Sequence, residues 1–179
     1  MEKCSECYIL LRMTDKKDQL AGAVASHLLV HGVTGQGIRA LAKAAGTSDR
    51  MLIYYFGSKE TLLRHSMDLI VQGLSDQLDA ELGNQQLPAD QLLGALTIKC
   101  HQPAWRPVIA LWFELVGLAV REVPPFRLIT HNIAGVFIKW IEEHLPASQR
   151  SEAADLFAHL EGRLMLSLLG VEENHVRTL

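Results

Sequence analysis

The sequence predicts an all-α protein, and three observations support this fold class. Apolar residues recur every three or four positions in most segments, as they do on the buried face of a helix. Glycine and proline stand between these segments, where they end helices. No neighbouring segments show the alternation of a strand pair. With 49% hydrophobic residues, a chain of 179 residues has ample apolar surface for a packed core.

The N-terminal part of the chain is expected to contain three short elements after a tail formed by residues 1–14. A first helix runs from about Asp15 to His31, with Leu20, Val24 and Leu28 on one stripe. The second helix runs from about Ile38 to Ala45. The first helix is expected to pack across the others and complete a three-helix unit.

A tight turn joins this second helix to a third. Gly46 breaks the apolar run, because glycine accepts the left-handed conformation that a sharp turn needs. Thr47 or Ser48 is expected to cap the next helix, Asp49 to Phe56, by accepting a backbone N–H. Gly57 is expected to end that helix. Helix, glycine turn and helix form the pattern of a helix-turn-helix, whose second helix enters a DNA major groove.

The segment from Lys16 to Arg64 resembles the DNA-binding domain of the tetracycline-repressor (TetR) family of bacterial transcription regulators. The resemblance is strongest in LAKAAG at residues 41–46 and in YYFGSKE at residues 54–60. It implies a recognition helix from Ser48 to Tyr55, with Tyr54 and Lys59 on phosphates. Gly37 and Ile53 depart from the family pattern. The predicted DNA-binding residues are Arg39, Thr47, Ser48, Asp49, Arg50, Met51, Tyr54, Tyr55 and Lys59.

Charge is distributed unevenly along the chain, although the net charge is −3. Residues 16–64 carry seven basic and three acidic side chains, a net charge of +4, whereas residues 65–179 carry a net charge of −6. A basic N-terminal part on an acidic remainder is typical of a DNA-reading head joined to a body that does not contact DNA. We expect residues 15–58 to form the head and residues 59–179 to form a helical ligand-binding and dimerisation body.

Five helices are expected in the body. The first is long, from Lys59 to about Leu82, and should carry signals from body to head. The others are expected at about 89–101, 107–121, 126–144 and 148–169. The segment PVIALWFELVGLAV is apolar nearly all round and is therefore expected to be central and buried.

A ligand pocket is expected among the middle helices, as the family resemblance implies. The candidate ligand-binding residues are Met67, Trp105, Trp112, Phe113, Glu114 and Phe137. Glu114 is notable because a buried carboxylate is costly unless it is paired or hydrogen-bonded. It would recognise a cationic or hydroxylated ligand, or else lie at the surface or pair with Arg121 or Arg106.

The last two helices are expected to form a homodimer interface, because the last one is more apolar than a single buried face requires. Leu160, Leu164 and Leu168 are core or interface positions, and Leu166 is expected on the outer face. The DNA partner would then be a double-stranded operator with inverted half-sites.

Two other functions compete with this one. A GxGxxA run at residues 35–40, between apolar segments 28–30 and 51–56, would suit a dinucleotide-dependent oxidoreductase. The crossover between those segments is too short for a parallel strand pair. A helical oligomeric small-molecule-binding protein without DNA recognition is the second alternative. We expect no cofactor, no catalytic residue, no membrane span and a cytoplasmic location. The pairs Cys4–Cys7 and His27–His31 lack further ligands for a metal.

Overall fold

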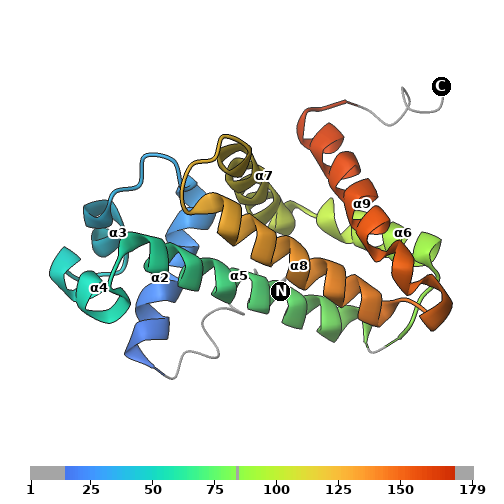
Figure 1. Cartoon of the computed structure of the whole chain (residues 1–179), viewed down its shortest axis with the longest axis horizontal. Coiled ribbons are helices and arrows are strands. Elements are labelled where there is room, and N and C mark those ends of the chain that lie inside the picture. Colours follow the sequence, from blue (N-terminus) through green and yellow to red (C-terminus); the bar gives the residue numbers. More distant parts are fainter. Residues whose placement is uncertain (1–14, 84, 172–179) are drawn as a thin grey trace.

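The computed structural model describes residues 15–83 and 85–171, and it confirms the all-α class (Figure 1). The α-helices of these residues are α2 (Lys16–His31), α3 (Ile38–Ala44), α4 (Asp49–Phe56), α5 (Lys59–Leu82), α6 (Ala89–Cys100), α7 (Arg106–Val120), α8 (Phe126–His144) and α9 (Ala153–Leu168). Two 3₁₀ turns, η1 (Pro103–Trp105) and η2 (Ala147–Glu152), precede α7 and α9. The predicted tail and the Cys4–Cys7 pair lie outside the described residues.

The helices form an elongated molecule with the short helices at one end (Figure 1). Helices α3 and α4 lie at that end, and α5 runs from there along the length of the molecule. Helix α8 packs beside α5, while α6 and α9 cover the other end. Helix α7 contacts α2, α8 and α9, so it joins the N-terminal end to the rest of the chain.

Side-chain caps explain where the N-terminal helices begin. The Asp15 carboxylate accepts the Lys17 N–H at 2.8 Å, the Ser48 hydroxyl accepts the Met51 N–H at 3.3 Å, and the Ser58 hydroxyl accepts the Thr61 N–H at 3.1 Å. Each bond satisfies a donor that a helix start leaves without an intrahelical partner. Of the two predicted caps for the second motif helix, Ser48 is the one observed.

Helix α5 is attached to its neighbours near both ends. Near its start, His65 Nε2 lies 2.8 Å from the Asp18 carboxylate on α2. Near its end, the Asp79 carboxylate accepts the Trp140 indole N–H from α8 at 2.7 Å. Between these points Met67, buried on α5, belongs to the core. The helix is therefore held by α2 near one end and by α8 near the other.

Two sequence expectations about the body helices were wrong. Helix α7 is not buried all round: Ile109, Leu111 and Leu115 are buried, but Val120 is 78% exposed. Its neighbours α2, α8 and α9 leave an outer face uncovered, which a single chain's sequence does not reveal. The last helix also begins later than expected, because η2 forms a 3₁₀ segment before α9.

One stretch that includes α7 is both long and strongly apolar. By length and composition alone, the stretch Pro103–Val120 is apolar enough to cross a membrane, and 22% of it is buried within the fold. Core helices of water-soluble proteins meet the same test. In this fold the stretch packs against α2, α8 and α9, and its Glu114 bonds to the N-terminal end.

The oxidoreductase alternative does not survive the fold. Residues 28–30 belong to α2 and residues 51–56 belong to α4, and the described residues contain no strand. Without strands there is no β-α-β unit to carry a dinucleotide on residues 35–40.

Candidate nucleic-acid interface and cavity

Helices α3 and α4 are held at a fixed angle by a short turn and a shared core. Gly46 in the turn has φ of +63°, in the left-handed region that favours glycine. Leu41 of α3 and Leu52 of α4 are fully buried, and Phe56 is 4% exposed. They pack with residues of α2 such as Leu28. Because this core takes one face of α4, the opposite face is turned to solvent.

The solvent face of α4 carries the side chains expected for contact with DNA. Arg50 is exposed, Met51 is 39% exposed and Tyr54 is 76% exposed. Tyr54 and Tyr55 meet edge to face, with ring centroids 5.3 Å apart. Ile53, which the sequence marked only as a departure from the family pattern, is 43% exposed and joins this face. The sequence could have indicated this position, because Ile53 follows Arg50 by three residues and residues at that spacing are neighbours on a helix surface.

The predicted contacts Arg39 and Asp49 pair with each other. The Arg39 guanidinium lies 3.4 Å from the Asp49 carboxylate, and both side chains are open to solvent. Such exposed pairs are worth little, so a phosphate can compete for the arginine. Asp49 also stands in the first turn of α4, where an acidic side chain interacts favourably with the helix dipole.

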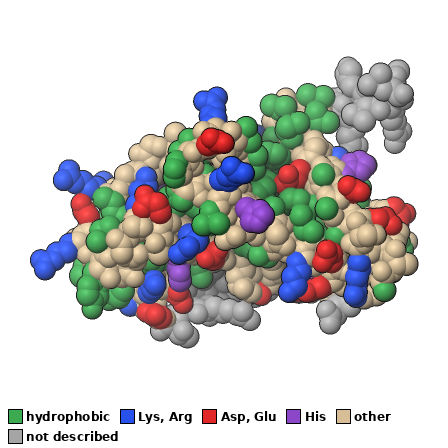
Figure 2. Space-filling view, in the orientation of Figure 1, with side chains coloured by type: hydrophobic (Ala, Val, Ile, Leu, Met, Phe, Trp, Pro, Cys, Tyr) green, Lys and Arg blue, Asp and Glu red, His purple; other side chains and the backbone are tan. Residues whose placement is uncertain are grey.

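The remaining predicted DNA contacts are less open. Thr47 and Lys59 are half-buried, and Ser48 is exposed but uses its hydroxyl oxygen to cap α4. Lys59 is the first residue of α5 and lines a hollow between the N-terminal end and the turn that follows α7. Figure 2 shows Lys and Arg side chains projecting from the end of the molecule that holds α3 and α4.

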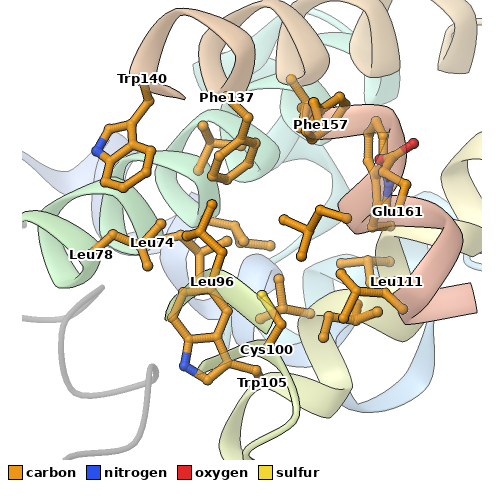
Figure 3. Close-up of a pocket in the computed structure, with 18 of the residues that line it drawn as sticks. Leu74, Leu78, Leu96, Cys100, Trp105, Leu111, Phe137, Trp140, Phe157 and Glu161 are labelled. Carbon is orange, nitrogen blue, oxygen red and sulfur yellow. Dashed lines mark hydrogen bonds between the residues drawn. The ribbon is translucent and has the colours of Figure 1, made fainter. Parts of the chain in front are cut away.

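A cavity lies in the body between α5, α6, α7, α8 and α9 (Figure 3). Its volume is about 110 Å³, far above the roughly 10–15 Å³ that one water molecule needs. The predicted residues Met67, Trp105, Trp112 and Phe137 line it, together with Trp140 and Phe157. All three tryptophans of the chain therefore stand on its wall.

Two predicted ligand-binding residues do not line this cavity. Phe113 is half-buried and packs against the core elsewhere. Glu114 points to the N-terminal end of the molecule, where its carboxylate accepts the Val33 N–H at 3.0 and 3.1 Å and the Thr34 N–H at 2.7 Å. Its hydrogen-bond partners are these backbone donors, so the expected pairing with Arg106 or Arg121 is not observed. The Val33 and Thr34 donors lie about 80 residues earlier in the chain, and helical periodicity cannot reveal a contact over that separation.

Glycine is required beside this carboxylate. Gly32 ends α2 with φ of +71°, and a Cβ built there would lie 2.5 Å from Glu114 Oε2. The absence of a side chain at Gly32 allows α7 to approach the loop that leads into α3. Glu114 thus joins the body directly to the segment that precedes the helix-turn-helix.

Sequence reasoning missed the one charged side chain on the described wall of the cavity. Glu161 of α9 lines it, and its Oε1 accepts the Trp112 indole N–H at 2.5 Å. Burial raises the pKa of the Glu161 carboxyl, and the Trp112 hydrogen bond opposes that rise. The sequence offered one signal for Glu161, which is an acidic residue directly next to the leucine stripe of α9. Burial also raises the pKa of the Cys100 thiol to about 12, so this wall residue stays protonated and neutral.

The possible metal sites of the sequence gain no support from the geometry. His27 and His31 lie side by side on α2, with ring centroids 4.4 Å apart, and His27 meets the Gln36 amide oxygen at 3.1 Å. Within residues 15–83 and 85–171 no third side chain completes a metal-ligand cluster.

These features define a class: a helix-turn-helix protein whose exposed second motif helix is joined to further helices that form a cavity lined mainly by apolar side chains. The family model described as "Bacterial regulatory proteins, tetR family" matches residues 20–65. Over 166 residues the chain is 25% identical to the HTH-type transcriptional regulator PksA of Bacillus subtilis (strain 168), covering 86% of this chain and 79% of that protein.

Solved structures share the fold over most of the chain. A protein of Rhodococcus sp. described as a TetR-family transcriptional regulator superposes with a TM-score of 0.71 at 19% identity, over 91% of this chain and 92% of that one. A transcriptional regulator of Streptomyces coelicolor A3(2) gives 0.67 at 23% identity, over 84% and 85%.

Residues 20–65 thus match the TetR family, and the chain is a DNA-binding transcriptional regulator. Proteins of this family are soluble DNA-binding regulators that generally are not enzymes, and they typically dimerise and respond to small-molecule effectors.

Proposed function

We propose that the chain is a cytoplasmic repressor that binds operator DNA as a homodimer and is released when a small molecule enters the body cavity. The single observation that carries the DNA-binding half is the exposed face of α4, formed by Arg50, Met51 and Tyr54 beside a basic head. Residues 15–58 would act as the head and residues 59–179 as the ligand-binding and dimerisation body.

In this proposal Arg50 reads a base edge and Lys59 binds a phosphate. Arginine on a recognition helix can bond bidentately to guanine in the major groove. Lys59 starts α5, and a helix N-terminus favours a bound phosphate. The predicted contacts Arg39, Thr47 and Tyr55 would surround these two residues on the DNA side, with Ser48 and Asp49 at the start of α4.

Salt dependence separates the two roles. Removing one lysine or arginine from a phosphate flattens the slope of log affinity against log salt by about 0.9. Lys59→Ala should therefore weaken binding to every sequence alike and flatten the slope by about that amount per subunit. Arg50→Ala should instead relax specificity at one base position, at a cost of about 1–3 kcal/mol. Equal, sequence-independent losses in both variants would contradict the base-reading role of Arg50.

The proposed dimer interface combines the outer faces of α8 and α9. Val136 on α8 is 46% exposed, and Met165 and Leu169 at the end of α9 are 46% and 69% exposed. Leu166, expected on the outer face, is half-buried, so Met165 is the better probe of this surface. Leu160 and Leu164 are buried within the chain and belong to its own core.

Two connections support coupling between the cavity and the head. Met67 lines the cavity from α5, and the same helix begins at Lys59 on the DNA side. Trp112 lines the cavity from α7, and two residues later Glu114 holds the loop at Val33 and Thr34. A ligand that moves either helix would change the spacing of the two heads in the dimer. Linkage then requires operator DNA to weaken ligand binding by the same factor.

The competing function is a helical oligomeric ligand-binding protein without DNA recognition. A protein of that kind should be retained weakly on heparin, with little dependence on salt. A DNA-binding head should be retained strongly, and its retention should fall steeply as salt is raised. The coupling itself is tested by measuring ligand affinity with and without operator, in wild type and in Met67→Ala. Identical ligand affinity with and without DNA in the wild type would contradict regulation by the body.

A further inference from the structure

A single carboxylate faces an otherwise uncharged cavity. Glu161 is the only charged side chain among the described residues that line it, and nearly all the others are aliphatic or aromatic. Figure 3 shows Glu161 at the edge of the cavity close to Phe157, with Leu74 and Leu78 across the cavity from it. A ligand in this cavity therefore meets apolar surface on most sides and one acidic group on one side.

The bonding of this carboxylate leaves one oxygen available. Oε1 accepts the Trp112 indole N–H, whereas Oε2 accepts no hydrogen bond from the residues that the structure describes. No cation of those residues forms an ion pair with Glu161. A carboxylate in apolar surroundings is stabilised most by a charged donor, since charge-assisted hydrogen bonds are about twice as strong as neutral ones.

Aromatic rings next to the carboxylate favour the same ligand chemistry. Phe157 lies between Trp112 and Phe137, with ring centroids 6.4 and 6.5 Å away. The faces of such rings attract cations, most strongly where water is excluded. An anionic ligand would instead find no cationic partner on the described wall and would be repelled by Glu161.

We propose that the cavity is built for a hydrophobic amine, bound as its ammonium form, with the nitrogen on Glu161 Oε2 and the apolar part against the aromatic wall. This inference rests on the proposed effector role of the cavity and names the chemical class of its ligand. The only other titratable group on the described wall is the neutral Cys100 thiol. The charge preference of the cavity is therefore set by Glu161.

The test uses three probes with one skeleton: 2-phenylethylamine, 2-phenylethanol and phenylacetate. Binding to the full chain is measured by calorimetry and by fluorescence of Trp105, Trp112 and Trp140, which all line the cavity. The amine should bind roughly tenfold or more tightly than the alcohol, as a charge-assisted hydrogen bond predicts, and phenylacetate should bind least. Amine affinity should fall as pH is lowered through the raised pKa of Glu161, while alcohol affinity should not.

Glu161→Gln keeps an oxygen for the Trp112 N–H but removes the charge, so it should bind the amine and the alcohol alike. Glu152→Gln, on the exposed η2 turn, is the matched control and should keep the wild-type preference. The wild-type series and its pH dependence decide the proposal even if Glu161→Gln folds poorly. An alcohol or phenylacetate that binds wild type as tightly as the amine would overturn the amine class, as would an amine preference that survives in Glu161→Gln.

The same experiment separates this inference from the proposed function. If the alcohol binds and weakens operator binding but the amine shows no advantage, the effector role stands and the amine class fails. If none of the three probes binds, the amine class is overturned, while the effector role is decided separately by the measurement of ligand affinity with and without operator.

Discussion

Replacing Glu114 by alanine tests the link between the body and the head most directly. The carboxylate accepts two backbone donors of the loop after α2, at Val33 and Thr34. Val33 is 3% exposed, so its N–H would be left without a partner inside the protein, at a cost of about 1–3 kcal/mol. Thr34 is exposed, and water can replace the carboxylate there at little cost.

The expected consequence is a measurable loss of stability. In a chain of this size about 1 kcal/mol corresponds to a shift of roughly 2–4 °C in Tm, so Glu114→Ala should lower Tm by roughly 2–12 °C. Glu114→Gln should cost less, because one amide oxygen still accepts an N–H. Its amide NH₂ would face the second donor without bonding to it. Glu143→Gln, an exposed acid on α8, is the control and should change Tm little.

Amide hydrogen exchange locates the effect. The Val33 N–H should exchange faster in Glu114→Ala than in wild type, while the amides of α8 should not change. The proposed coupling adds a functional readout: the ratio of operator affinities with and without ligand should move toward one in this variant. An unchanged Tm together with an unchanged exchange rate at Val33 would refute the argument that Glu114 holds this loop.

Three further predictions follow from the same geometry. Gly32→Ala should lower Tm more than Gly35→Ala, since both residues have positive φ but only a Cβ at Gly32 meets the Glu114 carboxylate. Combining Gly32→Ala with Glu114→Ala should lower Tm by less than the sum of the two single losses. Strictly additive losses in thermal melts would contradict the clash. Without ligand, Glu161→Gln should raise Tm near neutral pH, because the pKa of Glu161 is higher in the folded than in the unfolded state and its ionised carboxylate therefore destabilises the fold. This gain in Tm should shrink as pH falls toward the unfolded-state pKa. A gain in Tm that does not depend on pH would contradict this cause. Met165→Glu should give folded monomers with weak operator binding, whereas a wild type that sediments as a monomer at micromolar concentration would refute the dimer itself.

The N-terminal elements were predictable because their determinants are local. Helix starts depend on a side chain that bonds two or three residues along the chain, as Ser48 and Ser58 do. The turn depends on the left-handed conformation that Gly46 accepts. The exposed face of α4 then follows from helical period once Leu52 is assigned to the core.

The cavity was only partly predictable. Its aromatic wall was expected at Trp105, Trp112 and Phe137, because large apolar side chains on several helices tend to meet in the interior. Phe113 does not line this cavity, although its neighbours Leu111 and Trp112 do, and it packs against another part of the core.

The two acidic residues of the apolar helices mark the boundary between sequence and tertiary structure. Sequence alone determined that Glu114 interrupts an apolar helix and needs a partner, because an unpaired carboxylate is costly away from water, whereas the role of Glu161 was missed. Only the tertiary structure decided which partner each one has. Glu114 meets a backbone loop about 80 residues away and ties the head to the body, whereas Glu161 meets Trp112 and faces the cavity. Partners so distant in sequence are brought together by the packing of α7 against α2 and α9, which no local pattern encodes.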